Sequence, residues 1–561
     1  MKLLISQYLR LLRERDELDA LIPVLFMSMG IIPISHPQIG VRQDGVDIAA
    51  VGKDPQDGQD KLFLAVVKKG DIGRKDWNSG PQAIRPSLDE IFDVYLQNNV
   101  HPEHKALPIV IWVCTSGNLL QSVNENFVGY AKTKEFKADI VFCGADKLSE
   151  LIEQYLFNEN IFLGEDRKLL RKALVLVGDI DYDLSDYHSL LLSQLATTHD
   201  GNVAPQTEAE FQAALTRIHL ALNILIAWGD DAGNLKQPLL AAERTVLWTW
   251  HAIVKRDFLH SDRICEIFWA IYYTYFKISV GYLNKVGEYF VIKDGMSKVS
   301  SNSALISVSI FRQIAILSSI GITAIFMVKM GQERIQPTVE RIAVLLRAII
   351  ENNRASSSPR LDGNSIDINL ALIFFALNGD TDFAKAWLED LISKLVFVFA
   401  KKRYYPISSD NIEDLAQIEN DDSDKNSFHL KGTWLVPSVA IWCVLLNMEE
   451  RYRYFVEELI IKSPDIDPQL WHPTKEAYEQ FYFGNSVLAL GDTEVPISFD
   501  KKISEMKERI RKFKKREGYD LFKFSPAMQQ KFVALELLAC MHFRIPIPPV
   551  LIYSFLTEEK I

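Results

Sequence analysis

The sequence predicts an α/β domain at the N-terminus followed by a large all-α region. Up to about residue 160, segments with helical spacing of apolar residues alternate with short runs typical of β-strands. After about residue 165 the strand pattern nearly disappears, and long segments place apolar residues at a spacing close to 3.6. The chain has 561 residues, enough for several domains at about 150 residues each. We therefore expect an α/β domain over residues 1–165, a helical domain over 166–405, an acidic loop over 406–425 and a C-terminal helical lobe over 426–561.

The expected α/β domain begins with a helix and a pair of strands. The helix covers residues 2–29, with a break near Pro23, and ends at Gly30. An extended piece containing Pro33 and Pro37 follows it. Two strand-like runs, residues 45–52 and 61–68, then enclose a turn rich in Asp, Pro and Gly, a composition typical of a β-hairpin.

The rest of this domain alternates helix and strand. Helices are expected at about 87–98, 119–133 and 147–157, and buried strands at about 107–114 and 138–143. The order is therefore helix, strand pair, helix, strand, helix, strand, helix. A mixed sheet covered by helices is the expected packing for that order.

Beyond residue 165 the sequence predicts helices throughout. The periodic segments are Glu208–Trp228, Leu239–Lys255, Ile264–Lys285, Ser303–Met330, Gln336–Asn352 and Ile368–Phe399. They show no repeat of fixed length, which argues against a solenoid. Residues 408–425 contain seven Asp or Glu side chains, so we expect a solvated acidic loop that separates two helical lobes.

Composition and charge narrow the class of protein. Hydrophobic residues make up 48% and charged residues 24%, as in an ordinary globular protein. The net charge of −11 argues against a protein coated in basic surface, while a local basic patch stays compatible with it. The five cysteines lie far apart without a CxxC pair, which argues against a disulfide scaffold or a cysteine-rich zinc site. A reducing cytoplasm is the expected location.

Two segments bear on a membrane location. The N-terminus interleaves apolar and charged residues at helical spacing, unlike a signal peptide. The stretch from Ala304 to Lys329 is long and apolar, but it contains Arg312 and Gln313. We interpret it as a buried helix of a helical domain and expect no membrane partner.

The predicted hairpin places two chemically useful side chains together. Asp47 follows Gly45 at the start of one strand, and Lys68 stands at the end of the next, so both converge on one edge of the sheet. Phosphodiester hydrolysis uses such a pair: the carboxylate holds Mg²⁺ or Mn²⁺, and the lysine positions the nucleophile and stabilises charge. The simpler alternative is that Asp47 caps a strand and that Lys68 and Lys69 form a solvated strand end.

The order of motifs extends this pattern. Gly45-Val-Asp47, then Val66-Val-Lys68-Lys-Gly-Asp71, then Gln82 ahead of a helix, and a last strand that runs into Gly144-Ala-Asp146 together resemble the PD-(D/E)xK nuclease superfamily, in particular its Mrr-like restriction branch. The resemblance covers residues 1 to about 160. It implies a restriction-endonuclease-like fold, a metal ligand at Asp47 and the active-site lysine at Lys68. It also implies an acidic contribution from the first helix, with Glu14 the first candidate and Glu17 the second, and a role for Gln82.

One residue departs from the family pattern. The second acidic position, two residues before the lysine, is Val66, whose side chain cannot coordinate a metal. Shifting the register by one residue to Val67 and Lys69 does not supply a carboxylate. Either Glu14, Glu17 or Asp71 provides it, or the site has lost its metal.

Other motifs add little. The histidines form no HxH or HExxH spacing, and no GxxxxGK[ST] loop is present. Residues 501–516 predict an amphipathic helix with a basic outer face, which either follows a phosphate backbone or is an ordinary solvated face. The candidate nucleic-acid contacts are Lys69, Arg74, Lys512 and Lys515.

We therefore expect a metal-dependent endonuclease with DNA as its substrate and RNA as the alternative. Its catalytic residues are Asp47, Lys68, Glu14 and Gln82, and Asp47 with Glu14 holds Mg²⁺ or Mn²⁺. The helical region is expected to sense, recruit or assemble, through a protein partner or a homo-oligomer, in a build resembling prokaryotic anti-phage defence effectors. The competing hypothesis, which Val66 favours, is a catalytically inactive nuclease fold that serves as a scaffold or nucleic-acid-binding subunit.

Overall fold

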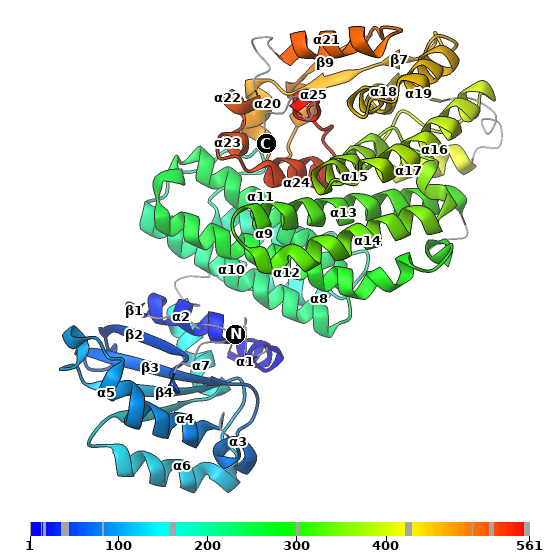
Figure 1. The fold of residues 1–561 in the computed structure, drawn as a ribbon. Coiled ribbons are helices and arrows are strands. Elements are labelled where there is room, and N and C mark those ends of the chain that lie inside the picture. The colour runs from blue at the N-terminus through cyan, green and yellow to red at the C-terminus, as the bar shows by residue number, and fades with distance from the viewer. Residues whose placement is uncertain are drawn as a thin grey trace. The chain divides into compact units, whose positions relative to one another are not determined.

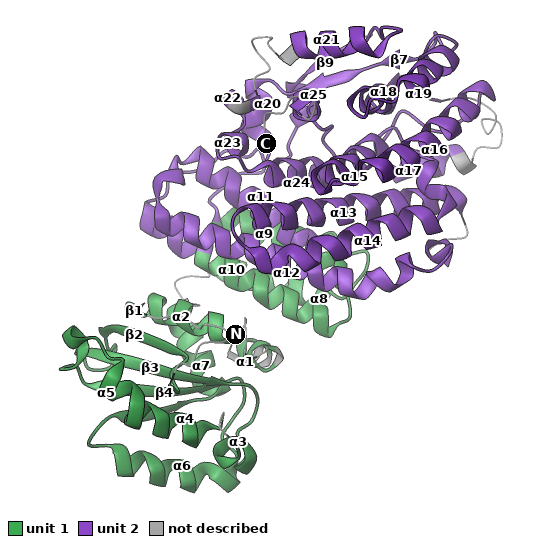
Figure 2. Ribbon diagram, viewed as in Figure 1, with its two compact units in different colours: residues 1–194, 216–238 green, residues 195–215, 239–561 purple. Residues whose placement is uncertain are grey.

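The computed structural model describes residues 2–12, 14, 18–34, 44–80, 83–156, 164–298, 302–420, 429–495, 497–514 and 521–554. An N-terminal α/β part is followed by a mostly helical part, which confirms the predicted fold class at that level (Figure 1). The chain divides into two compact units, residues 1–194 with 216–238 and residues 195–215 with 239–561 (Figure 2). The domain boundaries expected at residues 165, 405 and 425 stay predictions.

A five-stranded mixed sheet is the centre of the N-terminal part. Its strands are β1 (Ile31–Pro33), β2 (Ile48–Lys53), β3 (Asp60–Lys68), β4 (Ile109–Thr115) and β5 (Asp139–Cys143), and they lie in that order across the sheet. The first three strands pair antiparallel, while β3, β4 and β5 run parallel. The predicted hairpin and mixed sheet are confirmed. The extended piece after Gly30 adds the edge strand β1, where Pro33 is tolerated.

The helices of this unit are α1 (Lys2–Leu11), α2 (Asp19–Ser28), α3 (Arg74–Asn78), α4 (Ile84–Glu90), α5 (Leu96–Asn98), α6 (Gln121–Lys134), α7 (Ala145–Leu151), α8 (Gly164–Leu176) and α9 (Ser185–Gln194). The prediction of one first helix broken near Pro23 is wrong. Pro23 lies inside α2, near the middle of its ten residues, and does not end the helix. The segment instead forms two helices, with α1 ending at Leu11 and α2 beginning at Asp19.

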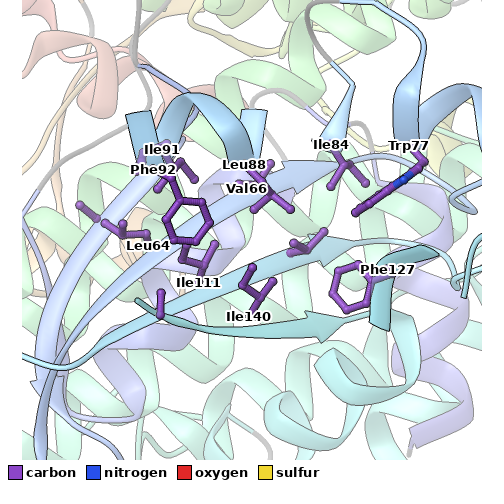
Figure 3. Packing of buried hydrophobic residues seen from close by; sticks show 14 of the residues in the cluster. Leu64, Val66, Trp77, Ile84, Leu88, Ile91, Phe92, Ile111, Phe127 and Ile140 are labelled. Atoms are coloured by element: carbon purple, nitrogen blue, oxygen red, sulfur yellow. The ribbon is translucent and has the colours of Figure 1, made fainter. Parts of the chain in front are cut away.

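Both faces of the sheet are buried, because successive residues point to opposite faces and β3 and β4 are buried along consecutive residues. On one face, Leu64 and Val66 of β3 pack with Ile111 of β4 against Leu88 and Ile91 from the helical segment after α3 (Figure 3). On the other face, Phe26 of α2 packs against Phe63 and Trp112, with ring centroids 5.9 and 5.0 Å from its own. The sheet therefore holds its strand ends in fixed positions.

The remaining helices are α10 (Glu208–Asp231), α11 (Lys236–Lys255), α12 (Asp262–Phe290), α13 (Ser303–Lys329), α14 (Gln336–Asn352), α15 (Asn364–Asn378), α16 (Thr381–Ala400), α17 (Ile412–Asn420), α18 (Leu435–Leu445), α19 (Glu449–Phe455), α20 (Lys475–Gln480), α21 (Ile503–Lys514), α22 (Leu521–Phe524), α23 (Pro526–Gln529), α24 (Val533–Phe543) and α25 (Pro549–Tyr553). Short strands β6 (Gly432–Thr433), β7 (Asp467–Pro468), β8 (Leu470–His472) and β9 (Asp492–Glu494) form two small sheets, so the region is mostly rather than wholly helical. The segment 368–399 is two helices, because Gly379 at φ +80° ends α15.

A loop was predicted over residues 406–425, but residues 412–420 form helix α17. The charged pattern concealed a short apolar face: Leu415 is fully buried in a cluster with Val308, Leu361 and Ile407. The Asn411 side chain accepts a hydrogen bond from the Glu413 N–H at 2.9 Å and caps the start of this helix. Residues 421–428 lie outside the described part of the chain.

Two helices, α10 and α13, are long and apolar enough to cross a membrane by length and composition alone. Half of the apolar stretch of α10 and 67% of that of α13 are buried inside the protein. In addition, α13 packs against α14, α15 and α24. This packing agrees with the interpretation of residues 304–329 as a core helix, while the cytoplasmic location stays a prediction.

A buried histidine in α11 gives the fold a testable pH dependence. His251 is 3% exposed, and its Nε2 lies 2.8 Å from the Gly201 carbonyl oxygen. Burial lowers the pKa of His251 to about 4, whereas an unfolded histidine titrates near 6.5. Between these values the unfolded chain binds more protons, so this contribution to stability is present above pH 6.5 and is lost as the pH falls toward 4.

We expect His251→Gln, which keeps a side-chain N–H donor, to remove this acid sensitivity. The difference in free energy of unfolding between pH 7 and pH 5, measured by urea denaturation, should shrink by about 2 kcal/mol relative to the parent protein. An unchanged difference would contradict the assignment of a neutral, buried His251.

Candidate functional site

Asp47 is fixed at the entrance to β2 by two backbone contacts. Its N–H donates to the Ala65 carbonyl oxygen at 2.9 Å, which extends the β2–β3 pairing by one residue. Its Oδ2 accepts the Val67 N–H at 2.7 Å. The turn before it needs Gly45, because φ is +84° and a Cβ there would lie 2.2 Å from the Ser87 carbonyl oxygen. Local backbone geometry thus directs the Asp47 carboxylate toward β3.

Lys68, the last residue of β3, meets a carboxylate from the segment between α1 and α2. Its Nζ lies 3.3 Å from Glu14 Oε1, and Glu14 Oε2 accepts the Lys69 N–H at 3.2 Å. The Lys68 side chain is only 20% exposed, so the ion pair is partly shielded from water. Of the two acidic candidates in the first helical segment, Glu14 contacts the lysine, and Glu17 lies outside the described residues.

The two carboxylates occupy neighbouring anchor points on one strand. Asp47 is bound to the N–H of Val67, and Glu14 to the N–H of Lys69, so the two amides flank Lys68. Glu14 thus contacts Lys68 at the end of β3, and the Asp47 carboxylate is bound to the strand one residue before that lysine.

The loop after β3 is clamped to the loop after β4. The Gly70 N–H donates to Ser116 Oγ at 2.9 Å, the Thr115 hydroxyl donates to the Gly70 carbonyl oxygen, and Asp71 Oδ1 accepts the Asn118 N–H at 2.8 Å. Gly117 permits this close approach, since a Cβ there would lie 2.4 Å from backbone atoms of Gly70 and Asp71. The clamp fixes the backbone that presents the Lys69 N–H to Glu14.

Val66 belongs to the core and not to the site. It is 1% exposed and packs beside Leu88 on the face covered by α4 (Figure 3). A carboxylate in this position would be buried among apolar side chains. Asp71, another candidate for the missing carboxylate, is exposed and bound to the Asn118 N–H, so it serves the loop clamp.

The other predicted site residues fall into three groups. Gln82 and Lys515 lie outside the described residues. Lys69 and Arg74 are exposed near the end of β3, whereas Lys512 is exposed on α21 in the other unit. Helix α21 buries Ile503, Met506 and Ile510, as the amphipathic pattern predicts.

Sequence reasoning missed the polar groups of the loop clamp. Thr115, Ser116 and Gly117 looked only like the end of a strand. Their position in the sequence could have identified them, because they directly follow a buried strand that is parallel to the strand of Lys68. Loops at the carboxyl ends of parallel strands commonly carry the side chains of a functional site. The Lys69 N–H was missed because a backbone donor leaves no mark in the sequence.

The side chains at the end of β3 include possible oxygen ligands for a divalent ion. Asp47 and Glu14 are oxygen ligands of the kind Mg²⁺ takes, and Mg²⁺ is often held by only one or two carboxylates, waters and substrate phosphates. Within the described residues, no group of three or more His, Cys, Asp and Glu side chains could hold a metal. The described residues therefore form no closed protein cage for a metal, and an ion at this strand end would take most of its ligands from water and substrate phosphate.

Comparisons with known proteins found no family model, no curated protein and no solved structure that matches this chain.

Proposed function

We propose that the N-terminal domain is a restriction-endonuclease-like domain of PD-(D/E)xK type that hydrolyses phosphodiester bonds in DNA, with RNA as the alternative substrate. The observation that carries the proposal is the pair of carboxylates, Asp47 and Glu14, bound to the backbone amides on either side of Lys68. The mixed sheet, with its antiparallel hairpin and parallel β3, β4 and β5, supports the same assignment.

Each side chain has a role in this proposal. Asp47 and Glu14 would hold Mg²⁺ or Mn²⁺, whose chemistry is Lewis acidity toward the phosphodiester and its attacking water. Asp47 is held rigidly because both its backbone and its carboxylate are bonded to β3. Lys68 places a positive charge at the strand end, where it stabilises negative charge that develops on the phosphate. Lys69 and Arg74, both exposed nearby, would contact the nucleic-acid backbone.

The test is incubation of the full chain with supercoiled plasmid, linear DNA and single-stranded RNA, with Mn²⁺ or Mg²⁺ and with EDTA. Cleavage that requires the metal supports the proposal, and the preferred polymer identifies the substrate. Absence of cleavage of all three polymers, including in the presence of a cell extract that supplies partners, contradicts it.

A second candidate function is favoured by one observation, the burial of Val66 in the core. In that account the domain is a nuclease fold without catalysis, and the protein is a scaffold or nucleic-acid-binding subunit of a larger complex. Lys68 and Glu14 would then be a structural ion pair. Binding of DNA that is independent of divalent metal, without cleavage, is the expected outcome for this candidate.

The helical region is proposed to sense, recruit or assemble, with a protein partner or a second copy of the chain. The defence role and the control of the nuclease by such a partner are part of the same proposal.

A further inference from the structure

Two cysteines stand opposite each other at the carboxyl end of the parallel strands. Cys114 of β4 and Cys143 of β5 are direct partners in the strand register. Partners on neighbouring parallel strands project their side chains from the same face of the sheet. Both are free thiols and both are fully buried. The sequence, in which 28 positions separate them, gave no hint of this pairing.

The spacing suits a covalent bond. Neighbouring strands lie about 4.7–4.9 Å apart, and cysteines joined in disulfides have Cα atoms about 4.4–6.8 Å apart. The neighbouring Cys143 thiol is the main reason that the pKa of Cys114 is raised well above its usual range, with burial as the second cause. The two thiols are thus close enough to influence one another.

We propose that Cys114 and Cys143 are a dithiol that hydrogen peroxide converts to an intramolecular disulfide. One thiol attacks the peroxide, giving a sulfenic acid and a water molecule. The second thiol attacks the sulfenic sulfur, which forms the S–S bond and releases a second water. Two thiols and one peroxide therefore yield one disulfide and two water molecules. Because both thiols are buried, the oxidant reaches them slowly, through opening of β5, which is the last strand of the sheet.

The pair lies in the same row as the candidate site. Val67, whose N–H binds the Asp47 carboxylate, is the register partner of Cys114, so a chain of neighbours runs from the Asp47 side chain through Val67 and Cys114 to Cys143. The negative charge of Asp47 also contributes to the raised pKa of Cys114. Thr115 follows Cys114 directly and clamps Gly70. A bond that repositions the end of β4 would therefore shift the loop that holds Glu14, and oxidation would lower activity. This last consequence rests on the proposed nuclease function.

The test is a thiol count on the full chain after exposure to hydrogen peroxide, followed by denaturation, alkylation and peptide mass spectrometry. We expect free thiols to fall from five to three and a peptide pair linked through Cys114 and Cys143, both restored by dithiothreitol. Half-buried Cys265 serves as an internal control for general oxidation. The Cys143→Ser protein should form no linked peptide under the same exposure.

Two results would contradict the proposed Cys114–Cys143 disulfide. One is oxidation of Cys265 while Cys114 and Cys143 stay alkylatable, and the other is oxidation of Cys114 or Cys143 without the linked peptide. The thiol count needs no activity, so it stands even if the protein cleaves no nucleic acid. If the disulfide forms and metal-dependent cleavage is unchanged, the pair is confirmed and its regulatory consequence is rejected.

Discussion

Replacing Lys68 by methionine is expected to reduce metal-dependent cleavage at least about a hundredfold, the cost typical of removing one group that stabilises transition-state charge. Methionine keeps the unbranched stem within β3 and removes only the ammonium group. The substitution should lower the cleavage rate at saturating nucleic acid and leave nucleic-acid binding little changed. Lys68 is partly buried beside Glu14, so in this account it acts on the reacting phosphate and not on the rest of the nucleic-acid backbone. The measurement is the initial rate of plasmid cleavage with Mn²⁺.

A matched control separates this effect from loss of positive surface charge. Lys132 is an exposed lysine on α6, and Lys132→Met should cleave at the parent rate. Circular dichroism and the melting temperature of each variant establish that both are folded. A Lys68→Met protein that cleaves within threefold of the parent would exclude this strand end as the catalytic site.

Replacing Arg544 by leucine is expected to lower the free energy of unfolding of the second unit by about 3–5 kcal/mol, the range seen when a buried ion pair loses one partner. The Arg544 guanidinium donates to both carboxylate oxygens of Asp410 at 2.7 and 2.8 Å and to Asp367 Oδ1 at 2.5 Å. It also reaches the Gly363 carbonyl oxygen at 2.8 Å. It therefore joins the end of α24 to the start of α15 and to the segment before α17.

The size of this effect follows from burial. The Asp367 side chain is fully buried, so removal of the guanidinium leaves a carboxylate in a low-dielectric environment. Residue 544 has φ +55°, a conformation that costs leucine and arginine a similar free energy. Backbone strain therefore does not contribute to the difference in stability between the variant and the parent protein. Arg451→Leu, which breaks an exposed ion pair with Glu389, should cost no more than about 1 kcal/mol. Urea denaturation followed by tryptophan fluorescence gives both values, and a loss below 1 kcal/mol for Arg544→Leu would contradict the account.

The sequence predicted an α/β part followed by a mostly helical part, and most of their elements, because periods of 2 and 3.6 are visible in the order of apolar residues. The sequence-based prediction failed where only a few residues determine whether a segment is a helix or a loop. The apolar face of α17 is short, and the acidic residues around Leu415 favoured a loop. Helix α2 continues through Pro23, so the boundary between α1 and α2 lies before the proline and not at it.

For the candidate site, the sequence predicted which residues lie at the strand ends, and the structure brings Asp47, Lys68 and Glu14 to the end of β3. What it could not predict depends on backbone positions. The anchoring of both carboxylates on the amides of Val67 and Lys69, and the register that sets Cys114 beside Cys143, exist only once strands are paired. The sequence also showed that Val66 departs from the PD-(D/E)xK pattern that the chain resembles. Its burial under α4 explains why the chain tolerates an apolar residue at this position.

The most direct test of the central claim is binding of Mn²⁺ by the full chain, measured by thermal unfolding and calorimetric titration on the parent, Asp47→Asn and Asp71→Asn proteins. Asparagine preserves an acceptor for the Val67 N–H and removes only the charge, while Asp71 serves the loop clamp. We predict that Mn²⁺ at ten times its Kd stabilises the parent and Asp71→Asn by about 1.4 kcal/mol, and that Asp47→Asn shows neither stabilisation nor binding heat. Equal binding by Asp47→Asn, or no binding by the parent, would contradict a metal-dependent site at the end of β3.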